Sequence, residues 1–356
     1  MEVFMRESST RSFNAVPITR RGNDGGRKKI IVAAMLAVAV AIAVFAVLII
    51  LEIADCGGEK PDDITKNSAF ENVTFEDKLY ASTDIHKGEL ILINASFPYV
   101  FPSETPTLLN CYDSRTVLGK SPTSGNNIYS YYTQSGPSGC AKFDPTMLTA
   151  LNALTDAFYG ATGNYDLFIY DEDGYRTYDE QAAKNQKNPT GYAPAGQTEH
   201  HLGTSVDFYG NVSSSKPIYK IDAPEYKSIY QWIYDNAYKY GFVLRYTEEK
   251  ASVTGVTNEP YHFRYVGLAH AEYMTKNGLC LEEYLDFIRD SHTKSSPLYF
   301  TGEKGTEYMI YYVPASTDNL TGISVPGENN AGVKYTVSGD NKAGFIVTVE
   351  KEAAAS

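Results

Sequence analysis

Two short polar segments concentrate the residue types that hold catalytic metal ions. Residues 198–210 read TEHHLGTSVDFYG and supply two histidines and an aspartate, while residues 258–264 read NEPYHFR and supply a glutamate and a histidine. Together they contain three of the six histidines of the chain. A catalytic zinc ion takes three protein ligands through nitrogen or carboxylate oxygen and keeps a fourth position open. Two histidines and an aspartate would therefore complete such a site.

In the first segment, a glycine separates the adjacent histidines His200 and His201 from a stretch with strand character. Polar and apolar residues alternate over 205–208, which is typical of a half-buried strand and directs Asp207 away from the core toward a cleft. Gly203 permits a tight turn, so the ligands would converge through a turn and a strand. The helical HExxH arrangement, with its ligands four residues apart, is excluded by this spacing. Either histidine could still be the ligand.

In the second segment, Glu259 precedes His262 by three residues. Positions i and i+3 of a regular strand lie on opposite faces, so both side chains reach one cleft only if a bulge or turn intervenes. Pro260 makes such a break plausible. If His262 is the third ligand, Glu259 is placed as a general base for the attacking water.

These residues resemble the motifs of a known family. TEHHLGTSVD resembles S-x-H-x-x-G-x-A-x-D, and EPYH resembles E-P-W-H, of the VanY-type D-alanyl-D-alanine carboxypeptidases, which are zinc peptidases of the LAS group. GYRTYDEQ, residues 174–181, resembles the Y-R-S-x-x-x-Q element of the same family. The resemblance covers about residues 79–289. Thr198, Ser205 and Tyr261 replace the usual Ser, Ala and Trp and leave the substrate preference more open than the metal site.

The resemblance implies a role for each matching residue. Registration on Gly203 and Asp207 selects His200, not His201, as a ligand. Zn²⁺ would then bind at the three positions where the family has its metal ligands, and Glu259 would act as general base and then as general acid. The arginine of the third motif would take part in both catalysis and substrate binding, and two further residues would contact the substrate. In this sequence the implied residues are, for the metal, His200, Asp207 and His262; for catalysis, Glu259 and Arg176; and for substrate binding, Arg176, Gln181 and Thr198.

The elements that must position these residues are a mixture of helices and strands without a regular βαβ alternation, which favours the α+β class. Helical signals include Asp144 as N-cap of a helix over 143–160, and Asp222 as cap of a helix that Gly241 ends. Residues 121–139 have the composition of a loop. The remaining expectations are a strand within 88–99, a strand, turn and helix over 165–186, a strand over 242–246, helices over 265–278 and 280–290, and strands over 307–315, 333–339 and 344–350.

The N-terminal region predicts a membrane anchor. Residues 30–51 form an uncharged apolar run that is long enough to span a bilayer and too long for the apolar region of a cleaved signal peptide. Residues 1–29 carry seven basic and three acidic side chains, so the positive-inside rule places them in the cytoplasm and the rest of the chain outside. Cys111 and Cys140 could pair as a disulfide there. The chain as a whole carries a net charge of -12, which argues against a nucleic-acid partner.

We therefore expect five regions: a cytoplasmic tail (1–29), a transmembrane anchor (30–51), a stalk (52–78), a catalytic domain (79–295) of mixed helices around a small antiparallel sheet, and a small β subdomain (296–350). The expected function is a single-pass, membrane-anchored, extracellular zinc carboxypeptidase that removes the terminal D-alanine from peptidoglycan stem peptides. Its partners would be these D-Ala-terminated peptides and the cytoplasmic membrane. The motifs leave DD and LD specificity open. The alternative is a non-catalytic wall-binding module that retains the fold.

Overall fold

The computed structural model describes residues 68–210, 219–224 and 226–352. The expected cytoplasmic tail, the apolar run over 30–51 and most of the expected stalk lie outside these residues. Within the described part of the chain, no helix is both long enough and apolar enough to cross a membrane.

The longest described helix, α3 (Pro145–Thr162), begins where its sequence predicts and continues past the predicted end at residue 160. The Asp144 side chain accepts hydrogen bonds from the backbone N–H groups of Thr146 and Met147, and Gly163 ends the helix in the left-handed conformation. Its apolar stripe is buried in the core of the catalytic region. The other helices are α2 (Cys111–Ser114), α4 (Tyr178–Lys187), α5 (Lys227–Asn236), α6 (Ala251–Thr254), α7 (Leu268–Lys276) and α8 (Leu281–Ser291), with 3₁₀ turns η1 (Ser68–Phe70), η2 (Ser82–His86), η3 (Glu199–Leu202), η4 (Ala237–Tyr240) and η5 (Glu248–Lys250).

The predicted start of the helix at Asp222 is wrong. The N–H groups of Tyr226 and Lys227 both bond to the Ala223 carbonyl, so the chain makes a separate turn before α5 begins. Tyr226, rather than Asp222, occupies the N-cap position. The predicted end is confirmed, because Gly241 takes a positive φ of 87° after η4 and β11 (Phe242–Tyr246) follows directly.

The strand predicted within 88–99 is also wrong, although its apolar residues are buried. Leu90 and Leu92 pack in a core cluster with α7 and α8, yet no strand is formed over these described residues. The backbone carbonyls of this segment find a hydrogen-bonding partner outside any sheet, since the Arg264 side chain donates to the carbonyls of Glu89 and Ile91. A side chain thus replaces the neighbouring strand that the hydrophobic pattern suggested.

Two short strands lie within residues 121–139, the segment that its composition predicted to be a loop. Residues 127–129 and 132–133 form β4 and β5, and β5 pairs in parallel with β7. Cys111 and Cys140 flank this segment as buried free thiols in contact with each other. Outside the site sheet, the strands between residues 109 and 220 are β2 (Leu109–Asn110), β3 (Val117–Lys120), β4 (Asn127–Tyr129), β5 (Tyr132–Thr133), β6 (Lys142–Phe143), β7 (Leu167–Ile169), β9 (Tyr209–Gly210) and β10 (Tyr219–Lys220).

A three-stranded antiparallel sheet carries the two predicted metal-binding segments. Its order is β11-β12-β8, with β12 spanning Glu259–Tyr265 and β8 spanning Ser205–Asp207. The register pairs His262 directly with Asp207. Cβ atoms of directly opposed residues lie about 4.5–5.5 Å apart, so this pairing by itself brings two candidate ligands together.

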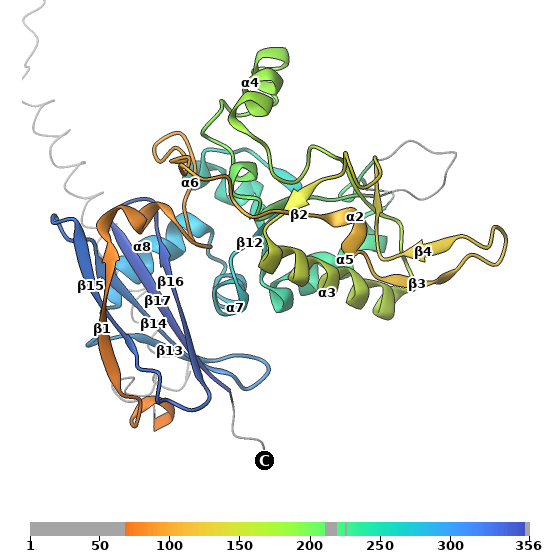
Figure 1. Ribbon diagram of the computed structural model, residues 1–356. Helices are drawn as coiled ribbons and strands as arrows, with labels where there is room; N and C mark the ends of the chain where they lie inside the picture. The colour runs from red at the N-terminus through yellow and green to blue at the C-terminus, as the bar shows by residue number, and fades with distance from the viewer. Residues whose placement is uncertain (1–67, 211–218, 225, 353–356) are drawn as a thin grey trace, which may run out of the picture. The chain divides into compact units, whose positions relative to one another are not determined.

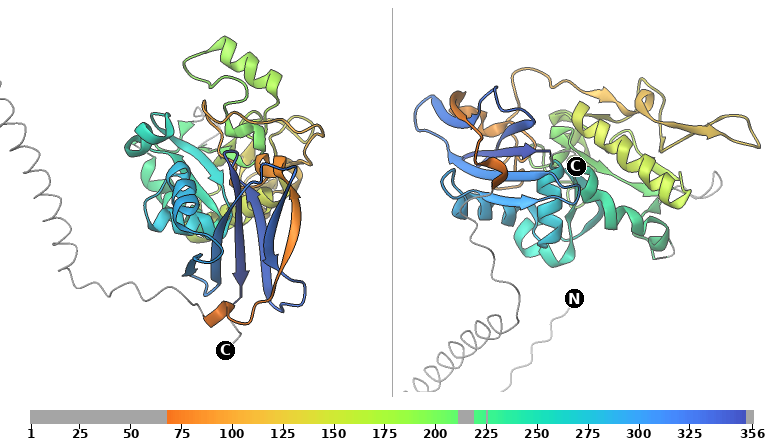
Figure 2. Two further views of the ribbon diagram at one scale, coloured as in Figure 1. Left: turned by 90° about the vertical axis from the view of Figure 1, so that its left-hand side faces the viewer. Right: turned by 90° about the horizontal axis from the view of Figure 1, so that it is seen from below.

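The predicted C-terminal strands are confirmed, and a separate two-stranded sheet joins a further C-terminal strand to an early segment. The four-stranded order is β13-β14-β17-β16, and β15 pairs with β1 (Phe75–Ala81) from near the start of the described chain. Figures 1 and 2 show β1, in orange, beside the blue C-terminal strands. The boundaries proposed at 79 and 296 remain predictions, but Leu79 itself lies in β1 and pairs with Gly322. The strands are β13 (Leu298–Thr301), β14 (Glu307–Pro314), β15 (Leu320–Pro326), β16 (Val333–Gly339) and β17 (Gly344–Lys351).

Both faces of this C-terminal sheet are covered. Along β14, Tyr308, Ile310 and Tyr312 pack with residues of α7 and α8, whereas Met309 and Tyr311 pack with residues of β15. This alternation follows from the two-residue repeat of a strand. The sheet therefore shares its core with the helices that follow the site sheet.

Candidate active site

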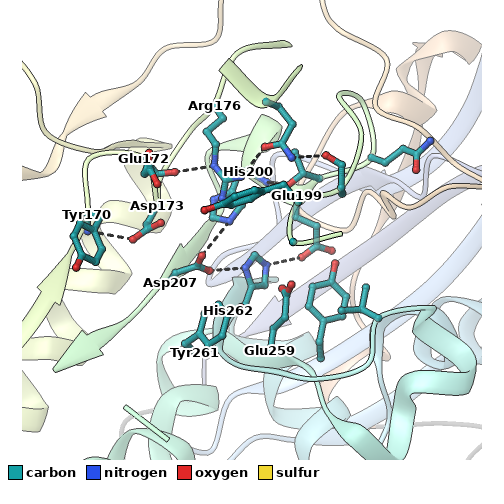
Figure 3. Close-up of a pocket in the computed structure, with 18 of the residues that line it drawn as sticks. Tyr170, Glu172, Asp173, Arg176, Glu199, His200, Asp207, Glu259, Tyr261 and His262 are labelled. Carbon is teal, nitrogen blue, oxygen red and sulfur yellow. Dashed lines mark hydrogen bonds and ion pairs between the residues drawn. The ribbon is translucent and has the colours of Figure 1, made fainter. Parts of the chain in front are cut away.

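Three predicted ligands converge at one point. One ligand atom each from His200, Asp207 and His262 can be chosen so that all three lie within 4.8 Å of one another, and all three residues are buried. Figure 3 shows the two imidazoles and the carboxylate directed toward one another at the floor of a pocket. Two nitrogens and one oxygen at this spacing are a donor set that suits a tetrahedral zinc ion with one open position.

The orientation of His200 leaves one ring nitrogen for a metal. Its Nδ1 lies 2.9 Å from the Gly174 carbonyl oxygen, to which Nδ1–H donates, and its Nε2 lies 3.6 Å from Asp207 Oδ2. Burial disfavours the imidazolium, and the Arg176 guanidinium adds to this effect, so the pKa of His200 falls to about 4. At neutral pH the ring is therefore neutral and Nε2 carries a free lone pair.

His201 is turned away and both of its ring nitrogens are engaged. The backbone N–H of Gly196 donates to Nε2 at 2.9 Å, so Nδ1 carries the proton and donates to the Arg176 carbonyl at 2.6 Å. The ring also packs against the aromatic rings of Tyr99 and Phe101. This histidine supports the backbone that carries Arg176, which agrees with the choice of His200 as the metal ligand.

His262 faces Asp207 with one nitrogen and Glu199 with the other. Its Nδ1 lies 2.7 Å from Asp207 Oδ1, and its Nε2 lies 3.4 Å from Glu199 Oε2. Burial disfavours the charged ring, but these two carboxylates outweigh burial and raise the pKa of His262 to about 10. Burial likewise opposes ionisation of Asp207, but the His200 and His262 rings hold its pKa well below the usual range.

The bulge required by the Glu259–His262 spacing is present. The register between β11 and β12 shifts between the pairs Leu244–Phe263 and Tyr246–Glu259, so extra residues of β12 are accommodated there. Glu259 and His262 consequently line the same pocket, and Figure 3 shows the Glu259 carboxylate beside the His262 ring. The pocket has a volume of about 420 Å³.

The predicted substrate-binding residues line this pocket as well, but Gln181 is already engaged. Its Oε1 accepts from Arg176 Nη1 at 2.6 Å, and its Nε2 donates to the Ala193 carbonyl at 2.6 Å. Arg176 Nε donates to the Glu172 carbonyl, which leaves Nη2 for the pocket. Thr198 caps η3, accepting from the His200 N–H through its Oγ1. Gln181 is thus placed to hold Arg176 rather than to reach a ligand directly.

Two buried acidic residues of the pocket escaped the sequence analysis. Glu199 lies inside the first motif, between Thr198 and His200, where the family pattern has an unspecified position. Burial opposes its ionisation, but the guanidinium groups of Arg245 and Arg264 outweigh burial and hold the pKa of Glu199 well below its usual range. Asp173 lies just before the arginine element, and burial together with the nearby Asp207 raises its pKa. A buried acid cannot be told from an exposed one by its sequence position alone.

Comparisons with known proteins agree with this geometry. Residues 142–268 match the family model VanY, described as D-alanyl-D-alanine carboxypeptidase. A D-alanyl-D-alanine carboxypeptidase of Enterococcus faecium is 32% identical over 292 residues, which cover 82% of this chain and 84% of that protein. A solved structure of the D,D-dipeptidase VanXYg with a D-Ala-D-Ala phosphinate analog is 25% identical, with a TM-score of 0.60, and covers 78% of this chain and 100% of that chain.

The fold and the site together define a peptidase of the α+β class whose pocket is built around a candidate metal centre. The chain belongs to the VanY family of D-alanyl-D-alanine carboxypeptidases. It is accordingly a hydrolase of the carboxypeptidase class, as the motifs predicted.

Proposed function

We propose that this protein is a zinc carboxypeptidase that removes the terminal D-alanine from peptidoglycan stem peptides. The convergence of His200, Asp207 and His262 beside Glu259 carries the proposal, because a module that only binds the wall has no need of a carboxylate at a metal centre. The family membership supports the same reaction.

The ligands for zinc would be His200 through Nε2, Asp207 through its carboxylate, and His262 through Nδ1. The other nitrogen of each imidazole has a hydrogen-bonding partner, as is usual for metal-bound histidine. When bound, zinc would supply Lewis acidity toward the scissile carbonyl and the attacking water.

The remaining steps belong to protein side chains. The Glu259 carboxylate takes a proton from the attacking water and then gives it to the leaving amine of D-alanine. Arg176 pairs through its free Nη2 with the peptide carboxylate or with the oxyanion as it develops. Gln181 and the Glu172 carbonyl hold that guanidinium in place, so it need not reorganise during the reaction.

The test compares the zinc-loaded parent with Glu259→Gln on purified pentapeptide and tetrapeptide muropeptides. The parent is expected to shorten at least one of them by a single alanine, which also separates DD from LD specificity. Glu259→Gln should bind about one zinc per chain and lose hydrolysis by roughly 10²–10⁴-fold, the usual contribution of a general base. Muropeptides bound but unchanged by the parent would instead identify a non-catalytic wall-binding module.

The location proposed from the sequence is the cell membrane, with the N-terminus cytoplasmic and the catalytic region outside. The apolar run at 30–51 and the basic residues before it support this proposal. Protease added to intact cells should digest the catalytic region of the full chain. Full protection, together with digestion after lysis, would contradict the orientation.

A further inference from the structure

The Glu199 carboxylate divides its two oxygens between different partners. Oε1 lies 2.8 Å from Arg245 Nε and 3.0 Å from Arg264 Nη1, whereas Oε2 lies 3.4 Å from His262 Nε2. His262 Nε2 is on the opposite side of the ring from Nδ1, which faces Asp207. One carboxylate therefore links two buried guanidinium groups to a candidate metal ligand.

We propose that Glu199 is a positioning residue for the metal centre, which holds the His262 ring with Nε2 protonated and Nδ1 toward the metal. An imidazole can bind a metal through either nitrogen, and the hydrogen bond made by one nitrogen selects the other as the ligand. The inference rests on the proposed function in one respect, namely that a metal binds at this cluster.

The surroundings of Glu199 leave its carboxylate little freedom. The Glu199 and Arg245 side chains have no solvent exposure, and neither does that of Arg264, so water does not compete for these contacts. Arg245 is itself clamped, because its Nη1 and Nη2 donate to the two carboxylate oxygens of Glu282 at 2.9 and 2.7 Å. Arg264 is tethered through Nη2 to the Glu89 carbonyl at 2.8 Å. A chain of charge-assisted contacts thus runs from α8 to the His262 ring.

The position of Glu199 in the chain strengthens the argument. Glu199 opens η3 and directly precedes His200, so a single 3₁₀ turn supplies one candidate ligand and the group that orients another. The aromatic ring of Tyr246 stacks on the His262 ring at 5.3 Å between centroids, which restrains the ring plane but selects neither nitrogen. The choice between nitrogens therefore falls to Asp207 on one side and Glu199 on the other.

A purely structural role for Glu199 makes a different prediction. If it only neutralised buried guanidinium charge, Glu282 would be its nearest counterpart, because both carboxylates bind Arg245, although Glu199 also pairs with Arg264. The matched pair Glu199→Gln and Glu282→Gln separates the two roles. Each variant removes one buried negative charge from the same arginine, but only Glu199→Gln alters the partner of His262.

The experiment measures zinc affinity of the full chain by competition with a chelator, and the visible absorption of the Co²⁺-substituted protein. Both variants should unfold at a lower temperature than the parent. Glu199→Gln should also bind zinc about 10–100-fold more weakly and change the Co²⁺ spectrum, while Glu282→Gln keeps the parental affinity and spectrum. Parental zinc affinity in Glu199→Gln, or an equal loss in both variants, overturns the proposal.

A second measurement needs no folded variant of Glu199. Long-range ¹H–¹⁵N correlation spectra of the zinc-loaded parent report which nitrogen of each histidine carries a proton, and the His262 signals are assigned by their loss in His262→Asn. The proposal expects a proton on Nε2 of His262. A proton on Nδ1 would overturn it. Both experiments read metal binding rather than turnover, so a protein that binds zinc this way but hydrolyses no muropeptide would contradict only the proposed function.

Discussion

At the scale of single residues, the adjacent histidines His200 and His201 show how hydrogen bonding assigns roles. Both are buried, and both donate through Nδ1 to a backbone carbonyl of the arginine element. They differ at Nε2, which faces Asp207 in His200 and accepts a backbone N–H in His201. Only the first has a lone pair directed at the candidate metal centre.

His200→Ala and His201→Ala should therefore separate metal binding from stability. His200→Ala removes a ligand and is expected to lose most of the bound zinc. His201→Ala leaves the Gly196 N–H and the Arg176 carbonyl unpaired, which costs about 1–3 kcal/mol of stability per buried group, while zinc binding is mostly kept. Zinc content after dialysis and denaturant unfolding measure the two effects. The opposite pattern of zinc loss would assign the ligand to His201.

At the scale of elements, the turn between β7 and α4 connects the arginine element to the first motif. The Gly174 carbonyl accepts from His200 Nδ1, and the Arg176 N–H donates to the His200 carbonyl at 3.0 Å. Gly174 also packs tightly, since an added Cβ would lie 2.6 Å from the Lys142 carbonyl oxygen. The absence of a side chain here allows the carbonyl to reach the ring of His200.

Gly174→Ala should consequently damage the metal site from a distance. The backbone must shift to relieve the clash, which moves the carbonyl that orients His200, and we expect weaker zinc binding together with about 1–3 kcal/mol lower stability. Gly160→Ala is the matched control, because Gly160 lies in α3 with open space around it. That change should stabilise the protein by about 0.5–1 kcal/mol. Unaltered zinc affinity in Gly174→Ala would show that the turn does not position His200.

At the scale of the whole molecule, His270 connects α7 to the C-terminal sheet. Its Nδ1 lies 2.6 Å from the Tyr284 hydroxyl and its Nε2 lies 2.9 Å from Thr348 Oγ1 in β17. Burial lowers the pKa of His270 to about 3. The ring is therefore neutral in the folded protein, whereas in the unfolded chain it takes up a proton near its ordinary pKa of about 6.5.

This difference predicts a pH-dependent stability. The unfolded state binds more protons between about pH 6.5 and pH 3, so the contribution of His270 is complete above pH 6.5 and falls by roughly 1.4 kcal/mol for each unit of acidification. Urea unfolding of the parent and His270→Asn at pH 7.5, 6.0 and 5.0 measures it. The variant should be less stable at pH 7.5, and its deficit should shrink as the pH falls. A deficit that stays constant with pH would rule out this linkage.

The sequence alone determined the parts of this protein that depend on local pattern. The N-cap of α3, the positive φ of Gly241 and the strand periodicity of the C-terminal region are short-range properties, so their bounds could be predicted. The metal ligands and Glu259 were predicted because their motifs resemble those of the VanY-type family, whereas the spacing alone left the choice between His200 and His201 open. Residues 88–99 were mistaken for a strand because hydrophobicity predicts burial but does not predict the partner of the backbone.

Tertiary structure decided which buried groups meet. The distance of 46 residues between Glu199 and Arg245 hides their ion pair from any local pattern, as does the distance between β1 and β15. The engagement of Gln181 with Arg176, the two filled nitrogens of His201 and the contact of Glu199 with His262 likewise depend on chain segments that only folding brings together. Residue type establishes what a side chain can donate or accept, but its partner is set by long-range packing, because hydrogen bonds and ion pairs act over only a few ångströms.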